Sequence, residues 1–176
     1  SDSVKKNLMQ EEITCEKQLL QPREAMLNLC CRLVREGKRL IAISDMYLPS
    51  NILLDILRTK KFSSISKVYV SCEAKARKDD KGTLFDYVLQ QEGITAENLF
   101  HIGDNEYSDY SMPLQKNICA LHIPSPLEII RQRGGNIAPS IKKYAHKDPL
   151  WGLLIGHSLE RIFHNPGEEK QDLNIC

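Results

Sequence analysis

The clearest hydrophobic pattern begins after Pro22, where apolar positions recur every three or four residues. In PREAMLNLCCRLVREGK one helical face would carry the apolar stripe Met26, Leu29, Cys30, Leu33 and Val34. Pro22 suits the first turn of a helix, and Gly37 suits the position just past its end. The pattern therefore predicts an amphipathic helix between Pro22 and Gly37.

A short apolar run follows this helix, and the helix-strand unit then recurs. Residues 39 to 44, RLIAIS, are too few for a buried helix, so we expect a buried parallel strand. Three more apolar helical stripes follow, at 50–61 with Ser50 as a possible cap, at 83–91 and at 111–116. Each precedes a short apolar run, at 67–72, 98–103 and 118–123 respectively. This alternation predicts an α/β fold with a Rossmann-like parallel sheet, right-handed crossovers and helices on both faces.

The pattern changes beyond His122. The next residues are rich in turn formers, and DPLWGLLIGHSLERIF then predicts an amphipathic helix opened by Asp148 and Pro149. We expect a helical extension over residues 124–164, whose apolar stripe packs against the protein, and a polar, frayed tail over residues 165–176.

Composition narrows the classes of partner and location. The 24 basic and 23 acidic residues of the 176-residue chain leave a net charge of +1 and are interspersed, which argues against nucleic acid or an anionic membrane as a partner. No apolar run is long enough to cross a bilayer, and the first residues do not resemble a signal peptide. The six cysteines lack C-x-x-C spacing and are expected to be small buried residues of a reducing compartment. A cytoplasmic globular protein is the expectation.

Polar residues follow three of the predicted strands. Ser44 and Asp45 follow the first, a lysine-rich loop containing Lys78 follows the second, and Asp104 and Asp109 follow the third. In an open parallel sheet, ligands bind beyond the carboxyl ends of the strands. Taken singly, each group has a structural explanation, because Ser-Asp suits a turn, lysines suit a solvated loop and aspartates suit helix caps.

The order of these groups resembles the second, third and fourth motifs of the haloacid-dehalogenase-like (HAD) hydrolase superfamily. The strings SDMYLP at 44–49 and HIGDN at 101–105, followed by SD, resemble a bacterial subgroup often fused to or encoded near glycosyltransferases. The resemblance covers residues 23–123, which become the expected HAD-like α/β core. QEEITCEKQLLQP resembles the last part of the subgroup's helical cap, so residues 1–22 are expected to be a cap remnant.

The resemblance implies roles for four residues in phosphoryl transfer. Ser44 would donate its hydroxyl to a phosphoryl oxygen, and Lys78 would neutralise the charge there and steady the attacking carboxylate. Asp104 would bind Mg²⁺, with Asp109 completing or orienting its shell. The substrate would be a phosphorylated small molecule.

Three positions depart from the family pattern. The loop ARKDDKG is one residue longer than usual, so Lys78 is the first choice for the site lysine, followed by Lys81 and Lys75. Pro113 falls where the family's helix continues, and we expect it to kink or delay that helix. Asn117 replaces a common glycine but can adopt the left-handed conformation that ends a helix.

The first HAD motif, a strand ending in Asp-x-Asp, does not occur in the sequence. In the family its first aspartate attacks phosphorus and its second is the acid and base. It lies on the central strand, between the strands matching 39–44 and 99–103, so its absence predicts two half-sheets with unpaired edges. Three arrangements remain open: the natural protein is longer, a second chain supplies the strand, or the two halves pair directly.

The presence of three HAD motifs and the absence of the first leave two expected functions. The first is a Mg²⁺-dependent phosphohydrolase of a phosphorylated small molecule, present here as a fragment without its nucleophile and inactive alone; the resemblance suggests a sugar-related substrate and a context of polysaccharide synthesis. The second is a degenerate, non-catalytic HAD-like module of a glycosyltransferase-associated protein. A flavodoxin-like or receiver domain would need an acidic cluster at an early strand end, which the sequence lacks.

Overall fold

The structure is a computed structural model that describes residues 2–125, 128–129 and 132. Most of the predicted extension at 124–164 and all of the tail at 165–176 lie outside these residues. Among the described helices, none is long and apolar enough to cross a membrane.

The chain divides into two compact units, residues 1–94 and residues 95–176. The boundary falls within the region 23–123, between the second and third predicted strands. Both units combine helices with a small parallel sheet, so the α/β class predicted from the alternating pattern is confirmed at that level.

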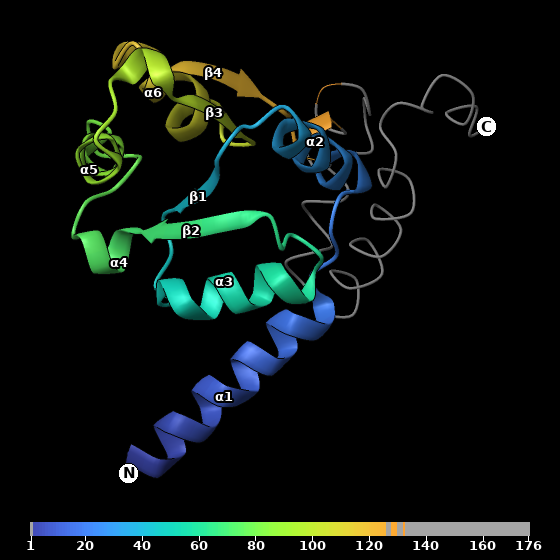
Figure 1. The fold of residues 1–176 in the computed structure, drawn as a ribbon. Coiled ribbons are helices and arrows are strands. Elements are labelled where there is room, and N and C mark those ends of the chain that lie inside the picture. The colour runs from blue at the N-terminus through green and yellow to red at the C-terminus, as the bar shows by residue number, and fades with distance from the viewer. Residues whose placement is uncertain (1, 126–127, 130–131, 133–176) are drawn as a thin grey trace. The chain divides into compact units, whose positions relative to one another are not determined.

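The first unit has a two-stranded parallel sheet flanked by helices (Figure 1). Its elements in chain order are α1 (Asp2–Leu19), α2 (Glu24–Arg35), β1 (Leu40–Ser44), α3 (Ser50–Thr59), β2 (Ile65–Val70), α4 (Ser71–Ala74) and α5 (Thr83–Glu92). The register of the sheet runs from Leu40 opposite Ile65 to Ser44 opposite Val70. The strand predicted at 39–44 is therefore confirmed. The one predicted at 67–72 ends two residues earlier, because the chain turns into α4.

Apolar stripes of α3 and α5 form much of this unit's core. Leu84, Phe85 and Val88 of α5 are fully buried, as their helical spacing predicted. Ile56 of α3 packs with Leu48 and with Ile13 of α1. By contrast, α2 has no fully buried residue, since a sheet of only two strands offers a helix little surface to cover.

Four helices end in the same way, with a residue in the left-handed conformation. These residues are Gly37, Lys61, Gly93 and Asn117. In each case the next amide donates to a carbonyl five residues back, which satisfies a backbone acceptor at the helix end. The prediction for Asn117 is therefore confirmed, with φ at 60°.

The expected cap at Ser50 is wrong. Pro49 occupies the N-cap position of α3, and its side chain makes no capping hydrogen bond. The amide of Ser50 instead donates to Oε1 of Glu73 at 3.0 Å. The Glu73 carboxylate thus accepts a backbone N–H at the start of α3, where the sequence predicted that the Ser50 hydroxyl would be the acceptor.

The second unit is built on another two-stranded parallel sheet. Its described elements are η1 (Ala96–Asn98), β3 (Phe100–Gly103), η2 (Glu106–Ser111), α6 (Met112–Gln115) and β4 (Cys119–His122). The strands pair in register from Phe100 opposite Cys119 to Gly103 opposite His122. The strands predicted at 98–103 and 118–123 are confirmed in kind, with shorter bounds.

A π-helical turn, η2, precedes α6 where the sequence pattern predicted one helix around residues 111–116. The amide of Met112 donates to the carbonyl of Tyr107, five residues back. Pro113 is the second residue of α6, which continues directly from η2 because Ser111 and Met112 both have helical dihedrals, and its ring has no N–H to donate to the preceding turn. The expected disturbance at Pro113 thus takes the form of a wider turn just before it.

The two sheets have the strand orders β1-β2 and β3-β4. Each sheet lies within one unit, β1-β2 in the first and β3-β4 in the second. One face of the β3–β4 sheet carries Phe100 and Leu121, which are 58% and 45% exposed.

The cysteines are less buried than expected. Cys15, Cys31, Cys72 and Cys119 are exposed, and Cys30 is intermediate. The prediction of buried cysteines is therefore wrong for these residues. Cys72 leaves the strand for α4, and Cys119 occupies the exposed face of β4, because alternate residues of a strand point to opposite faces.

Candidate functional site

The carboxyl end of β1 is joined to the lysine-rich loop by Asp45. Ser44 is the last residue of β1, and Asp45 follows it. Both carboxylate oxygens of Asp45 accept the backbone N–H of Lys78, each at 3.0 Å. A carboxylate acceptor makes this a charge-assisted interaction, stronger than one between neutral groups. Asp45 thereby fixes the backbone of Lys78 at the end of the strand that carries Ser44.

The loop between α4 and α5 is held by further polar contacts of its own. The guanidinium of Arg77 donates to both oxygens of Asp79, at 2.7 and 2.6 Å. The hydroxyl of Thr83 donates to Oδ1 of Asp80 at 2.7 Å, and this hydrogen bond lowers the pKa of Asp80 below its ordinary value. These contacts hold the loop in a defined conformation.

The three candidate lysines occupy different backbone environments in this loop. Lys75 and Lys81 both have left-handed backbones, with φ of 51° and 38°. They stand where the chain bends on either side of Lys78, whose amide is bound by Asp45. The choice of Lys78 among the three remains a prediction.

In the second unit, the carboxyl end of β3 leads into a capped turn. Asp104 directly follows the strand, and its side chain is exposed. Oδ1 of Asn105 accepts the amides of Tyr107 and Ser108, at 3.0 and 2.8 Å. The helix cap considered for Asp104 or Asp109 is thus provided by Asn105, and Asp104 is not needed for it.

Asp109 is turned into the protein. It is 4% exposed, and its Oδ1 lies 2.9 Å from Nε2 of His101, which is itself 8% exposed. Its Oδ2 accepts the backbone amide of Asn105 at 3.1 Å. Each oxygen of this carboxylate therefore has a partner inside the unit, as a buried carboxylate requires. Asp109 holds the turn that begins at Asp104.

Gly103 makes room for this carboxylate. A methyl group at residue 103 would lie 2.6 Å from Oδ2 of Asp109, far inside van der Waals contact, and it would also collide with Cγ. The backbone of Gly103 has an ordinary φ, so glycine is needed here for space and not for its conformational freedom. Neither this packing nor the role of His101 was predicted from the sequence. A histidine two residues before the strand-ending glycine was the available signal.

His122 supports the same turn from β4. Its Nε2 lies 3.0 Å from the backbone oxygen of Asp104 and 3.4 Å from Oε2 of Glu128. Its ring also contacts Tyr110. The main chain of Asp104 is therefore held from the neighbouring strand while its carboxylate stays exposed.

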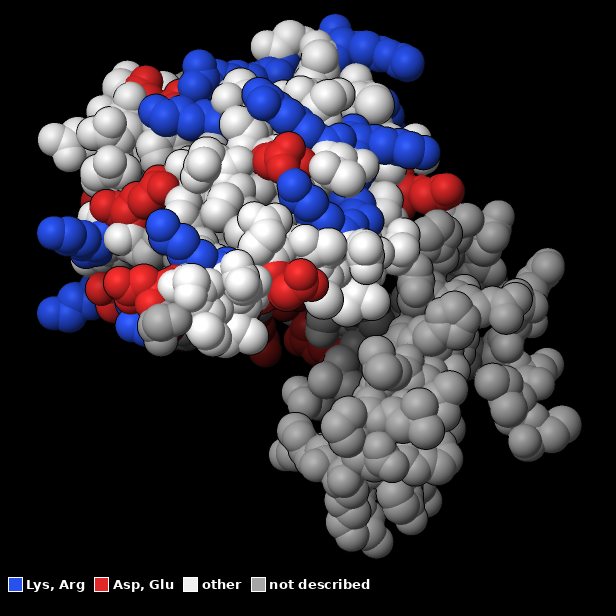
Figure 2. Space-filling model, turned by 90° about the horizontal axis from the view of Figure 1, so that it is seen from below, with Lys and Arg blue, Asp and Glu red and all other residues white. Residues whose placement is uncertain are grey.

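The predicted site residues fall into two local groups, one in each unit. Ser44 and Lys78 belong to the first unit, and Asp104 and Asp109 belong to the second. Within the described residues, no group of three or more His, Cys, Asp or Glu side chains is arranged to hold a metal ion. On the face shown in Figure 2, acidic and basic side chains are interspersed, without a large patch of one sign.

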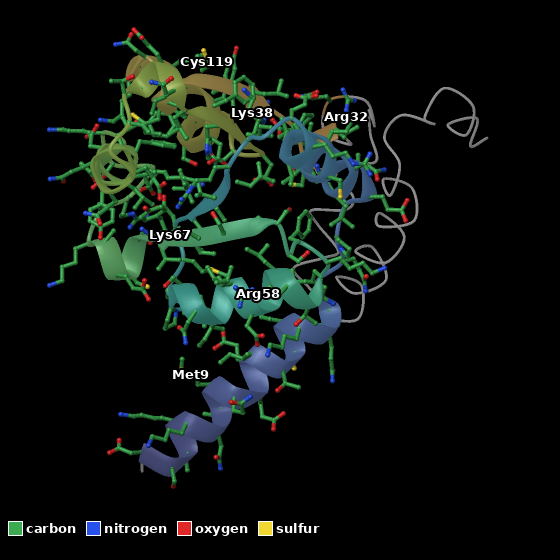
Figure 3. The ribbon with its side chains drawn as sticks, in the orientation of Figure 1. Met9, Arg32, Lys38, Arg58, Lys67 and Cys119 are labelled. Atoms are coloured by element: carbon green, nitrogen blue, oxygen red, sulfur yellow. The ribbon has the colours of Figure 1, made fainter. Side chains whose placement is uncertain are left out.

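A separate pocket of about 370 Å³ lies along β2 and is lined by residues of α3, β2, α4 and α5. None of the four predicted site residues lines it. Lys67, labelled on β2 in Figure 3, lies 4.5 Å from the centre of the Tyr69 ring and 3.9 Å from Glu92. Lys67 thus already contacts an aromatic ring and a carboxylate within the unit, and we do not place the site in this pocket.

No protein-family model matches the sequence, and no curated protein matches it as a relative.

Proposed function

We propose that the region 23–123 is part of a HAD-like phosphohydrolase core which, once completed by its nucleophile, acts on a phosphorylated small molecule such as a sugar phosphate. The observation that carries the proposal is the double hydrogen bond from the Lys78 amide to Asp45. It links the residue that follows Ser44 to the loop bearing the proposed site lysine. Two groups suited to a phosphate thus belong to one preorganised strand end.

In this proposal Ser44 and Lys78 bind the phosphoryl group. The Ser44 hydroxyl donates to one phosphoryl oxygen, and the Lys78 ammonium offsets the negative charge that the oxygens carry in the transition state. Asp45 would hold the Lys78 backbone in position at the strand end that carries Ser44. Because the loop is already fixed, little reorganisation is needed when the phosphate arrives.

Asp104 is the proposed ligand of Mg²⁺. Mg²⁺ commonly takes one or two carboxylates and completes its shell with water and phosphate oxygens, so one exposed carboxylate at a strand end suits it. When bound, Mg²⁺ would supply positive charge beside the phosphoryl oxygens. Asp109 would orient this ligand, since both of its oxygens accept hydrogen bonds from His101 and Asn105.

The nucleophile must come from outside the 176 residues, because no Asp-x-Asp occurs in them. We place it on a further strand that pairs with the free edge of β1, whose described partner is β2 alone. Either a longer natural chain or a second chain can supply that strand. The present chain would then bind phosphate and metal but would not hydrolyse the ester.

A second function, a non-catalytic HAD-like module, is favoured by two observations. The sequence lacks the nucleophile motif, and Asp109 is turned inward. Such a module would keep the fold and serve a larger protein as a structural or interaction unit. It would not need to bind Mg²⁺ or phosphate.

Calorimetric titration of Mg²⁺ in the presence of inorganic phosphate separates the two functions. The phosphohydrolase proposal expects joint binding that Asp104→Asn abolishes and that Glu106→Gln, an equal charge change two residues away, leaves intact. Lys78→Ala should weaken phosphate binding more than Lys75→Ala or Lys81→Ala. Absence of any joint binding by the wild-type chain would favour the non-catalytic module.

A further inference from the structure

Helix α1 has two apolar faces, and only one of them is covered within the first unit. Ile13 packs against Leu48 and Ile56, while Glu12 accepts a hydrogen bond from Tyr47 and Lys17 donates one to Asp55. These contacts fix α1 on the α3 side. They leave the other side of an 18-residue helix, about 27 Å long, without a partner in the unit.

The uncovered side carries an apolar stripe. Val4, Leu8, Cys15 and Leu19 follow one another at intervals of four, seven and four residues, which places them on one helical face. Val4, Leu8 and Leu19 are 54%, 66% and 68% exposed, and Cys15 is exposed as well. Figure 1 shows the N-terminal half of α1 extending beyond α3. Exposed apolar rows of this kind commonly mark an interaction surface.

The spacing of the stripe is symmetric along the helix. If two copies of α1 pack antiparallel, Val4 meets Leu19 of the second copy and Leu8 meets its Cys15. Both pairs are centred on the same point, between Glu11 and Glu12. One two-fold axis therefore brings all eight apolar side chains together, as a self-complementary interface requires.

The charges flanking the stripe fit the same arrangement. Lys5 and Lys6 lie in the N-terminal half of α1, whereas Glu11, Glu12 and Glu16 lie towards its C-terminal end. Lys5 and Glu16 lie on the same flank of the stripe, and antiparallel packing places Lys5 beside Glu16 of the second copy. Complementary flanking charges select the partner and the orientation of paired helices.

We propose that the exposed face of α1 is a homodimerisation surface, on which a second copy of this chain packs through an antiparallel α1 pair. The interface consists of the stripe Val4, Leu8, Cys15 and Leu19 with Lys5–Glu16 ion pairs at its sides. Glu11 lies near the two-fold axis beside its own symmetry mate, so this repulsion weakens the dimer. The inference is independent of the phosphohydrolase proposal, because α1 carries none of its site residues.

Sedimentation equilibrium of the full 176-residue chain over a range of concentrations tests the proposal. The wild-type chain should dimerise reversibly. Leu8→Glu should weaken the dimer by at least about tenfold, because it places a charge in an apolar contact twice per dimer. Asn7→Lys, which also adds a charge but lies off the stripe, should leave the dimer unchanged. Glu11→Gln should tighten it, an effect that misfolding cannot imitate.

Charge exchange tests the orientation. Lys5→Glu and Glu16→Lys should each weaken the dimer, and the double variant should restore it. Leu8→Cys should form a disulfide between residue 8 of one copy and Cys15 of the other, identified by peptide mapping after mild oxidation. A monomeric wild-type chain, a dimer that Leu8→Glu does not affect, or cross-linking of residue 8 to residue 8 would each overturn the proposal.

Discussion

Nε2 of His101 lies 2.9 Å from Oδ1 of Asp109, and both side chains are almost completely buried. The pair joins β3 to η2 across the turn that contains Asp104. Because the other carboxylate oxygen of Asp109 accepts the Asn105 amide, one buried side chain holds both ends of the turn. The exposed Asp104 carboxylate therefore projects from a rigid backbone.

Loss of His101 should destabilise the second unit. His101→Ala leaves Oδ1 of Asp109 buried without this donor, which we expect to cost about 1 to 3 kcal/mol of unfolding free energy. Urea unfolding, followed through NMR signals of the β3 and β4 amides, measures the change. Glu97→Ala, an exposed substitution in η1, is the control and should change stability by less than about 0.5 kcal/mol. Equal stability of the two variants would show that the pair is not structural.

Gly103→Ala should disrupt the same turn by overpacking. The added methyl group collides with the Asp109 carboxylate, and we expect a cost of about 1 to 3 kcal/mol together with loss of hydrogen-exchange protection at the Asn105 amide. Gly93→Ala is the control. It strains a left-handed backbone, but its methyl group meets open space and collides with no neighbouring side chain. That control should leave Asn105 protected. Full protection in Gly103→Ala would contradict the packing described.

Removal of the Asp45 carboxylate should free the lysine-rich loop. Asp45→Ala deletes both acceptors of the Lys78 amide, so exchange of that amide should accelerate by at least about tenfold, the equivalent of a hydrogen bond to a charged group. Asp45→Asn keeps one oxygen acceptor and should have a smaller effect. Ser44→Ala should leave the exchange rate unchanged. An unchanged rate in Asp45→Ala would show that the loop is held by other contacts.

The Thr83–Asp80 hydrogen bond should be visible in an NMR titration. The Thr83 hydroxyl is the largest cause of the lowered pKa of Asp80, so Thr83→Val should raise that pKa towards its ordinary value of 3.8. A lowered folded-state pKa adds stability above the unfolded pKa, and this contribution is lost as the pH falls through the folded value. The loop of the wild-type chain should accordingly loosen below about pH 4. A Thr83→Val variant with an unshifted Asp80 pKa would contradict this assignment.

Local rules anticipated most of the fold. The alternation of apolar stripes and runs predicted α3, α5 and all four strands, and the capacity of Asn117 for a left-handed backbone predicted a helix end. Predictions failed where a distant group replaced a local one. Glu73 satisfies the amide of Ser50 from 23 residues away, and no local preference contains that information.

Motif order selected Ser44, Lys78, Asp104 and Asp109 as candidate site residues, but it did not indicate which contacts hold them. Asp45 was assigned only to a turn, although its carboxylate binds an amide 33 residues away. His101 lies within the HIGDN motif, but no role was predicted for it. Its partner Asp109 lies in a π-helical turn, which helical periodicity does not predict. Sequence patterns specify which groups follow the strands, whereas tertiary contacts decide which of them face inward.

The proposed phosphohydrolase function requires Ser44, Lys78 and Asp104 to serve one phosphate and metal site. The most direct measurement is paramagnetic relaxation by Mn²⁺, which replaces Mg²⁺, in NMR spectra of the chain with inorganic phosphate. We predict that broadening at Gly103 to Asn105 is accompanied by broadening at Ser44, Asp45 and Lys78, and that Asp104→Asn removes both. Broadening confined to residues near Asp104, or spread over unrelated acidic surface residues, would contradict the proposed site.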